Sequence, residues 1–252
     1  MKIPLMLWLL SFLFIPSCFG INKVESNSKP IDHVIWDELL KKHINDDGLV
    51  NYKGFMQDSL QLKSYLKLLS KNHPNDANWS NDEQLAYWLN AYNAFTIKLI
   101  LDYYPVKSIK DIAGAIPFIN SSWDLKFIQI ENETYDLNNI EHGIIRNQFN
   151  EPRIHFALVC AAVSCPPLRN EAYQAEKLEK QLQNQAYRFI NDSSKNKITP
   201  EQAQLSKIFS WYKGDFTHQK SLLEYLNLHS EIKLTKDTEI NYLDYDWQLN
   251  EI

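Results

Sequence analysis

The sequence predicts an α+β protein in which N-terminal helices, including one long buried helix, pack on a mostly antiparallel sheet. Amphipathic helical patterns fill the first part of the chain, and most segments with strand-like alternation follow later. Helices that precede strands favour the α+β class over α/β proteins, in which the two alternate. At 252 residues, 13% of them aromatic, the chain can bury one sizeable core, so we expect a single domain over residues 31–252.

The N-terminal part of this domain reads as three helices. Asp32 can cap the first helix, and a second amphipathic helix is expected from Met56 to Lys71. Ser80 and Glu83 form a capping box for a third helix, which runs from Asn81 to about Tyr104 and has little polar face after its first turn. Such a helix is buried on most sides.

Two asparagines, Asn90 and Asn93, lie three residues apart on one face of that helix. Buried amides need hydrogen-bond partners, so each must bond to backbone or to another side chain.

The rest of the domain contains the expected strands, together with three further helices. The strand from Arg153 to Cys160 has the clearest alternation, which places Arg153 and His155 on one face, and a proline-stiffened loop follows from Ala161 to Arg169. The other expected elements are a hairpin of Leu125–Ile130 and Thr134–Leu137, helices at Asn138–Arg146, Glu176–Ile190 and Ser221–Leu228, and strands at Lys197–Thr199, Leu205–Trp211 and Glu239–Tyr245.

The first twenty residues read as an export signal. Lys2 precedes an apolar run that is too short to span a bilayer, so residues 1–20 are expected to be a signal peptide and residues 21–30 a polar tether. Ile15–Cys18 resembles a bacterial lipobox, in which Cys18 would carry a lipid and attach the protein to the membrane. Ordinary cleavage after Gly20 is the alternative. We therefore expect a periplasmic or membrane-anchored lipoprotein, or otherwise a secreted protein.

The net charge of −5 gives no support to nucleic-acid binding, which requires a basic surface. No Cys-x2-Cys pair and no His-Glu-x-x-His helix is present, so we expect neither a metal site nor a cofactor.

Three of the four arginines fall between Glu141 and Arg169, together with two histidines and two cysteines. One hypothesis makes Cys165 a nucleophile and His155 its base, with Arg153 and Arg169 as anchors for an anionic group and Asn90 as an oxyanion or orienting group. The additional ligand-binding candidates are Glu141, His142 and Asn93.

Simpler interpretations stand beside this hypothesis. Cys160 and Cys165 can form a disulfide that only fixes the loop, because an oxidising compartment favours their pairing. Instead of acting as acid and base, Glu141 can pair with Arg146, one turn further along the short helix, and His142 can be a polar surface residue.

Several motifs in this order resemble the DUF547 family, a domain of unknown function. The motifs are Tyr87–Ala94, Ile140–His142, Pro152–Cys160, Ser164–Arg169 and Trp211–Phe216, and the resemblance covers residues 82–216. A remoter likeness is to the papain and transglutaminase-like folds, in which a buried helix packs on an antiparallel sheet. Those folds place a nucleophilic cysteine at the start of that helix, whereas the long helix of this chain contains no cysteine.

The sequence thus leaves two functions open. The first is thiol-dependent acyl transfer or amide hydrolysis on a peptide of the cell envelope. The second is a binding module that has no catalytic activity, in which the arginines hold an acidic ligand or partner and Cys160 and Cys165 form a structural disulfide.

Overall fold

The computed structural model describes residues 26–114 and 120–252 of the chain. The predicted signal peptide, Cys18 and residues 21–25 of the predicted tether lie outside these residues. The helices are α1 (Val34–His43), α2 (Tyr52–Gln57), α3 (Ser59–Ser70), α4 (Asn81–Tyr103), α5 (Lys110–Gly114), α6 (Arg146–Gln148), α7 (Ile154–Ala157), α8 (Leu178–Asn191), α9 (Ile208–Trp211), α10 (Lys213–Phe216) and α11 (Leu222–His229). Shorter helical turns are η1 (Ser122–Asp124), η2 (Asn139–Ile145, a π-helix) and η3 (Ala175–Lys177).

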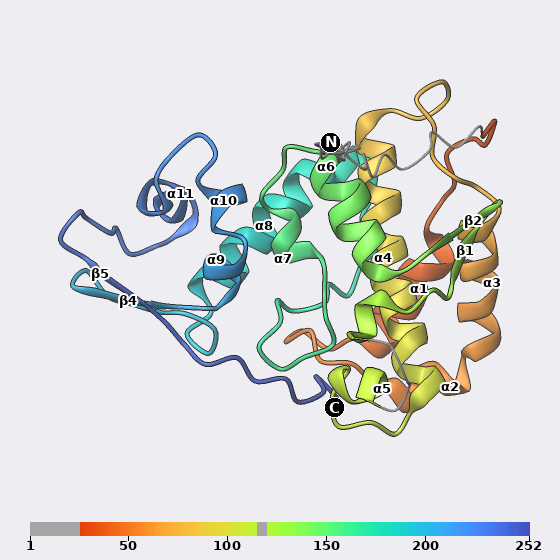
Figure 1. Ribbon diagram of the computed structural model, residues 1–252, viewed down its shortest axis with the longest axis horizontal. Coiled ribbons are helices and arrows are strands. Elements are labelled where there is room, and N and C mark those ends of the chain that lie inside the picture. Colours follow the sequence, from red (N-terminus) through yellow and green to blue (C-terminus); the bar gives the residue numbers. More distant parts are fainter. Residues whose placement is uncertain (1–25, 115–119) are drawn as a thin grey trace, which may run out of the picture.

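The strands form two small sheets, and the α+β class is confirmed. Strands β1 (Ile128–Ile130) and β2 (Glu133–Tyr135) form the expected antiparallel hairpin. In the second sheet β3 (Lys197–Ile198) pairs antiparallel with β4 (Gln202–Leu205), which pairs parallel with β5 (Glu239–Tyr242). Figure 1 shows α1 to α4 at one end of the molecule, β4, β5 and α11 at the other end, and α7 and α8 between them.

Helix α4 is the centre of the larger part. Ser80 and Glu83 form the predicted capping box, and the helix is buried along most of its length. It packs against α2, α3 and η2, and Trp88 contacts Tyr135 of the hairpin edge to face. The long buried helix is thus confirmed, and it is surrounded mainly by other helices.

Two apolar clusters fill the interior. The larger one surrounds α4, and the smaller one lies among α8, β4, α9 and α11. Helix α7 joins them, because Ile154 and Ala157 belong to the larger cluster and Phe156 stacks on Phe189 and Phe216 in the smaller one.

The predicted strand at Arg153–Cys160 is wrong. This segment forms the short helix α7 and then an extended connection, and residues 154–159 are all buried. The alternation in the sequence arises because successive apolar residues serve two different clusters, not because one face of a sheet is exposed. The predicted strand at Leu205–Trp211 is also wrong beyond Leu205, since α9 begins at Ile208.

A C-terminal strap, residues 245–252, runs back from β5 toward α5 (Figure 1). Glu251 forms a parallel bridge with Val50, and Leu249 forms an antiparallel bridge with Ala162. The buried Asn250 accepts a hydrogen bond from the Tyr52 hydroxyl at 2.8 Å. The end of the chain therefore joins the N-terminal helices to the loop after α7.

At the other terminus, the described part of the predicted tether is bonded to the domain. The Ser26 hydroxyl donates to Glu131, and the backbone carbonyl of Ser28 accepts from the indole of Trp79 at 3.1 Å. None of the helices in the described part of the chain combines the length and the hydropathy that a membrane crossing requires.

Candidate functional site

A cavity of about 260 Å³ opens between η2, α7, α9 and the C-terminal strap, and it brings together most of the predicted site residues. Glu141, His142, His155, Cys160 and Cys165 all line it. Its walls are largely aromatic. The rings belong to Tyr92, Trp123, Trp211, Tyr212, Tyr245 and Trp247.

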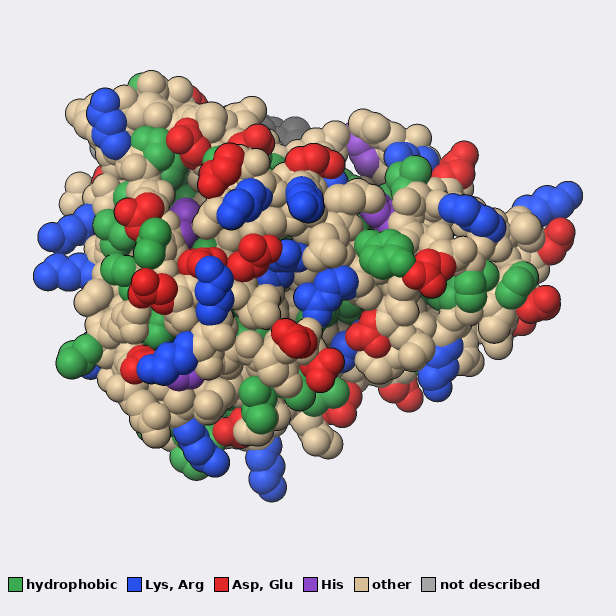
Figure 2. All heavy atoms as spheres, turned by 180° about the vertical axis from the view of Figure 1, so that it is seen from behind, with side chains coloured by type: hydrophobic (Ala, Val, Ile, Leu, Met, Phe, Trp, Pro, Cys, Tyr) green, Lys and Arg blue, Asp and Glu red, His purple; other side chains and the backbone are tan. Residues whose placement is uncertain are grey.

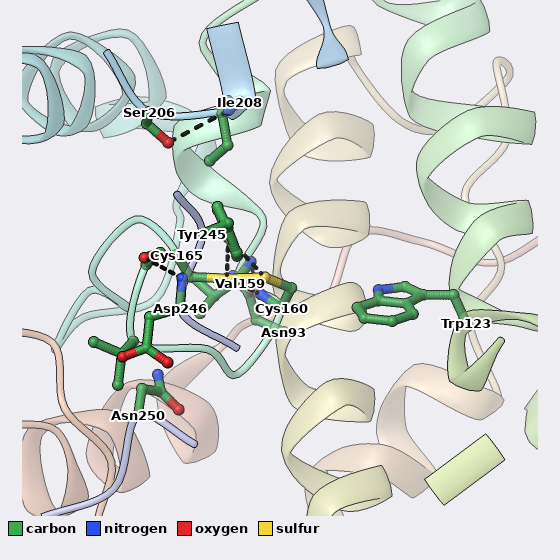
Figure 3. Close-up of a disulfide and its surroundings, with 12 residues drawn as sticks. Asn93, Trp123, Val159, Cys160, Cys165, Ser206, Ile208, Tyr245, Asp246 and Asn250 are labelled. Atoms are coloured by element: carbon green, nitrogen blue, oxygen red, sulfur yellow. Dashed lines mark hydrogen bonds between the residues drawn. A yellow bond between two sulfur atoms is a disulfide. The ribbon is translucent and has the colours of Figure 1, made fainter. Parts of the chain in front are cut away.

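The two cysteines form a disulfide in the cavity wall, as Figure 3 shows. The Cys165 sulfur accepts a hydrogen bond from the backbone N–H of Cys160 at 2.9 Å, and the hydroxyl of Tyr245 lies 3.3 Å from it. The same hydroxyl lies 3.2 Å from the Cys160 sulfur. Cys165 is 3% exposed, whereas Cys160 is only partly buried. Opposite the disulfide, Trp123 turns its indole ring toward it.

The backbone on both sides of the disulfide is held by the rest of the fold. Asn93 of α4 donates to the carbonyl of Ala157 at 2.9 Å and accepts from the N–H of Val159 at 3.0 Å. The loop that follows Cys160 bonds to the strap, through Val163 N–H to Gln248 and Ser164 N–H to Asp246. Asn93 thus positions the cysteine segment and does not line the cavity.

His155 is clamped between an aromatic ring and a carboxylate. Its ring stacks on Tyr212 with 3.8 Å between centroids, and its Nε2 lies 2.7 Å from Asp215 Oδ2. Burial lowers the pKa of His155, and the hydrogen bond to Asp215 opposes this shift. The neutral imidazole is therefore favoured, and a proton on Nε2 leaves Nδ1 as the basic nitrogen.

Asp215 is itself held by Arg146. The guanidinium donates from Nε and Nη2 to the two carboxylate oxygens, both at 2.7 Å. The hydrogen bonds from His155 and Arg146 hold the pKa of Asp215 well below its usual value. Arg146 also donates from Nη1 to Nδ1 of His142 at 3.0 Å, so Arg146 pairs with Asp215 and His142 and not with Glu141, the partner expected from the sequence.

Glu141 lies deeper in the cavity wall, where it is 5% exposed. Its Oε1 accepts a hydrogen bond from the Tyr212 hydroxyl at 2.6 Å. Burial raises the pKa of Tyr212, and the neighbouring Glu141 adds to the effect, so this hydroxyl keeps its proton.

The predicted anion anchors lie elsewhere. Arg153 forms hydrogen bonds with both Glu151 and Glu179, and Arg169 pairs with Glu171 and donates to Asn184. Neither arginine lines the cavity. The three arginines near the site are thus each engaged by other side chains of the chain, and Figure 2 shows acidic and basic side chains interspersed over one face of the molecule.

Asn90 is also outside the cavity. It donates to the carbonyl of Tyr173 at 2.8 Å and accepts from the N–H of the same residue at 3.0 Å. Like Asn93, it uses both ends of its amide to hold an irregular backbone segment. No oxyanion-stabilising role follows from this position.

Sequence reasoning missed Asp215 and the aromatic wall. Tyr212 and Asp215 belong to the motif Trp211–Phe216, which was noted only as part of a family pattern. Buried histidines are often oriented by a carboxylate, so Asp215 in that motif could have been predicted as the partner of His155. The strap residues Tyr245 and Trp247 carried no such signal.

Within residues 26–114 and 120–252, no cluster of three or more histidine, cysteine or acidic side chains has the arrangement of a metal site. The cavity is lined by the two sulfurs, the imidazoles of His142 and His155 and the Glu141 carboxylate.

Residues 77–190 match the model of a family described as "Protein of unknown function, DUF547". The matched segment includes α4, η2, α7 and both cysteines of the disulfide. No curated protein and no solved structure is significantly similar to this chain, so the likeness to papain and transglutaminase-like folds is not confirmed.

Proposed function

We propose that this chain, which belongs to the DUF547 family through residues 77–190, is a thiol-dependent enzyme that performs acyl transfer or amide hydrolysis on a peptide of the cell envelope. The observation that carries the proposal is the single cavity lined by both cysteines and by His155, whose ring is oriented by Asp215. A disulfide is the resting form expected of two close cysteines in an oxidising compartment, and it agrees with export.

The reaction begins with reduction of the disulfide by an external dithiol, which is oxidised as Cys160 and Cys165 each become a thiol. Cys165 is the better candidate for the nucleophile because the backbone N–H of Cys160 already donates to its sulfur, whereas the Tyr245 hydroxyl lies within reach of both sulfurs. Hydrogen bonds from these groups stabilise a thiolate and lower the pKa of a thiol.

His155 takes the thiol proton on the imidazole nitrogen that does not face Asp215. The thiolate attacks the carbonyl carbon of the substrate, and the bond from that carbon to the leaving amine breaks. His155 returns the proton to the departing amine. Water, or a second amine, then attacks the thioester and releases Cys165.

The rival function, an arginine cluster that holds an acidic ligand, has less support. Arg146, Arg153 and Arg169 each have carboxylate partners within the chain, so an acidic ligand would have to displace them. The rival function gives the disulfide a structural role only, and the following test decides whether that is its role.

The test uses two variants that differ only in which sulfur remains. Cys160→Ser keeps Cys165 and removes the disulfide, and Cys165→Ser does the reverse. Iodoacetamide alkylation and the acylation burst with p-nitrophenyl acetate should be faster for Cys160→Ser than for Cys165→Ser by about tenfold or more. Wild-type protein should show this reactivity only after reduction. Equal, slow reaction of both thiols, at the rate of free cysteine, would leave the disulfide with a structural role only.

A further inference from the structure

The aromatic side chains around the cavity form one continuous wall. The ring centroids of Tyr245 and Trp247 lie 4.6 Å apart, those of Trp211 and Tyr245 lie 4.8 Å apart, and those of Trp123 and Trp247 lie 5.8 Å apart. The faces of such rings carry partial negative charge and attract cations. Aromatic cages that bind cations are built mainly of tryptophan and tyrosine, and this wall has the same composition.

Two cations of the chain itself already lie over rings of this wall. The Nζ of Lys110 is 4.4 Å from the centroid of a Trp247 ring, and the guanidinium carbon of Arg146 is 5.3 Å from that of Tyr212. Neither cation lines the cavity. The wall therefore attracts positive charge. Lys110 and Arg146 contact its rings from outside, so neither of these two cations occupies the cavity itself.

The polar side chains of the cavity sum to one negative charge. Arg146 and Asp215 do not line the cavity, and their charges cancel as a bidentate pair beside it. His142 accepts a hydrogen bond from Arg146 at Nδ1, and burial favours the neutral form of His155. Glu141 remains, and among the described residues no lysine, arginine or histidine forms an ion pair with it.

A buried carboxylate whose hydrogen bonds come from hydroxyl groups alone is costly to keep ionised, and a bound cation offsets that cost. An acidic ligand would be repelled by the charge of Glu141 and by the negative faces of the rings. A neutral apolar ligand would fill the cavity without using either feature.

We propose that this cavity binds an alkylammonium group, with its positive charge near Glu141 and its carbon shell against Trp123, Tyr245 and Trp247. This inference rests on the proposed function in one respect: the substrate of the thiol reaction would carry the alkylammonium group. The binding itself needs no reactive sulfur and can be measured separately.

The probe pair is choline and its neutral carbon isostere 3,3-dimethylbutan-1-ol, which share shape and differ in charge. Binding is followed through the indole N–H signals of Trp123, Trp211 and Trp247 in NMR spectra, at constant ionic strength set with sodium chloride. Choline should bind at least about tenfold more tightly than the alcohol. Equal affinity for the two probes, or tighter binding of sodium acetate, overturns the proposal.

Glu141→Gln keeps the size of the side chain and removes its charge. This variant should lose about tenfold in affinity for choline and little for the alcohol. Trp247→Leu should weaken choline binding in the same direction, and retained signals of the other tryptophans show that each variant is folded. Lys63→Gln, which removes a cation from the exposed surface of α3, is the matched control and should bind choline as the wild type does.

A protein with both cysteines replaced by serine separates the two proposals. If it binds choline while the single-cysteine variants show no thiol reactivity, the ammonium site stands and the enzyme proposal falls. If the Cys160→Ser variant reacts and none of the proteins prefers choline to the alcohol, the enzyme proposal stands and the ammonium site falls.

Discussion

His155 shows how two neighbours and burial give one side chain its chemistry. Tyr212 covers one face of the ring, Asp215 holds Nε2, and burial keeps the imidazole neutral. The nitrogen that does not face Asp215 is then the basic one, and His155 lines the cavity. In the proposed mechanism, Asp215 orients the ring and stabilises the imidazolium once it forms.

The first prediction tests that role of Asp215. Asp215→Asn, made in the Cys160→Ser background, should slow iodoacetamide alkylation of Cys165 by about tenfold or more, because His155 loses a bond that raises its pKa and becomes a weaker base. The rate is measured as a function of pH. Asp102→Asn, which changes an exposed ion pair with Lys98, is the control and should leave the rate unchanged. An unchanged pH profile in Asp215→Asn would contradict the role of the carboxylate.

The second prediction concerns a buried histidine outside the site. Burial lowers the pKa of His33 from 6.5 to about 4, and the ring bonds to the Tyr65 hydroxyl at 2.8 Å. Between pH 4 and 6.5 the unfolded chain takes up a proton that the folded chain does not. Stability is therefore full above pH 6.5 and falls as the pH is lowered toward 4, by about 2 kcal/mol between pH 6.5 and 5 for this residue.

Urea unfolding of His33→Gln at several pH values measures this contribution. The variant should show a shallower loss of stability with acid than the wild type. Other groups with lowered pKa values, among them His73, His155, His229 and Asp215, account for the remaining slope. His218→Gln, at an exposed position, should keep the slope of the wild type. Parallel curves for His33→Gln and wild type would show that His33 is not the source.

At the scale of elements, α4 organises the site through its two asparagines. Asn90 and Asn93 each pair with both polar groups of a nearby backbone segment, one at Tyr173 and the other between Ala157 and Val159. These segments lie in no sheet, so the side-chain amides supply the hydrogen bonds that a neighbouring strand would otherwise provide.

The third prediction compares the two asparagines. Asn90→Ala and Asn93→Ala should each lower the free energy of unfolding by about 2 to 4 kcal/mol, because each leaves a buried N–H and a buried carbonyl without a partner. Only Asn93→Ala frees the segment before Cys160, so only this variant should speed reduction of the disulfide by dithiothreitol. The Asn90→Ala protein is the matched control. Equal rates of disulfide reduction in the two variants would show that Asn93 does not protect the disulfide.

The same elements show what the sequence could predict. The α4 helix and the β1–β2 hairpin follow from local patterns: a capping box with a long apolar run, and two alternating segments joined by a short turn. The strand predicted at Arg153–Cys160 fails because Ile154 and Phe156 are buried on opposite sides in two clusters, which local alternation cannot distinguish from a sheet. The cysteine pair and His155 line one cavity, although the segment that carries His155 is a helix and not the predicted strand.

The arginines and the aromatic wall could not be predicted in this way. Arg153 meets Glu179 across 26 positions, and His155 meets Asp215 across 60. Which carboxylate neutralises which arginine depends on contacts between distant segments. Charge clustered in the sequence therefore suggested an anion site that the fold replaces with internal ion pairs.

At the scale of the whole molecule, the C-terminal strap connects parts that are far apart in the chain. It supplies Tyr245 and Trp247 to the cavity, bonds the loop after Cys160, and reaches Val50 beside the N-terminal helices. The second sheet and the aromatic wall are continuous with it, because β5 leads directly into the strap. Stability and the shape of the cavity should therefore depend on the same contacts.

Several of these contacts are made by Asn250, and the fourth prediction concerns this residue. Its side chain accepts from Tyr52, its backbone N–H donates to Ala161, and its carbonyl accepts from Val50. Asn250→Ala leaves the buried Tyr52 hydroxyl without its acceptor and should cost about 1 to 3 kcal/mol in urea unfolding. Asn241→Ala, at an exposed residue of β5 whose side chain bonds to Glu239, should change stability by less than about 0.5 kcal/mol.

The position of Asn250 also predicts an effect at a distance. If the strap holds the aromatic wall in place, loosening its end should shift the indole N–H signal of Trp247 and weaken choline binding, although Asn250 does not line the cavity. Asn241→Ala should leave both unchanged. A destabilised Asn250→Ala protein whose Trp247 signal and choline affinity match the wild type would mean that the wall is held by its own ring contacts, among them the pairs of Trp247 with Tyr245, Trp211 and Trp123.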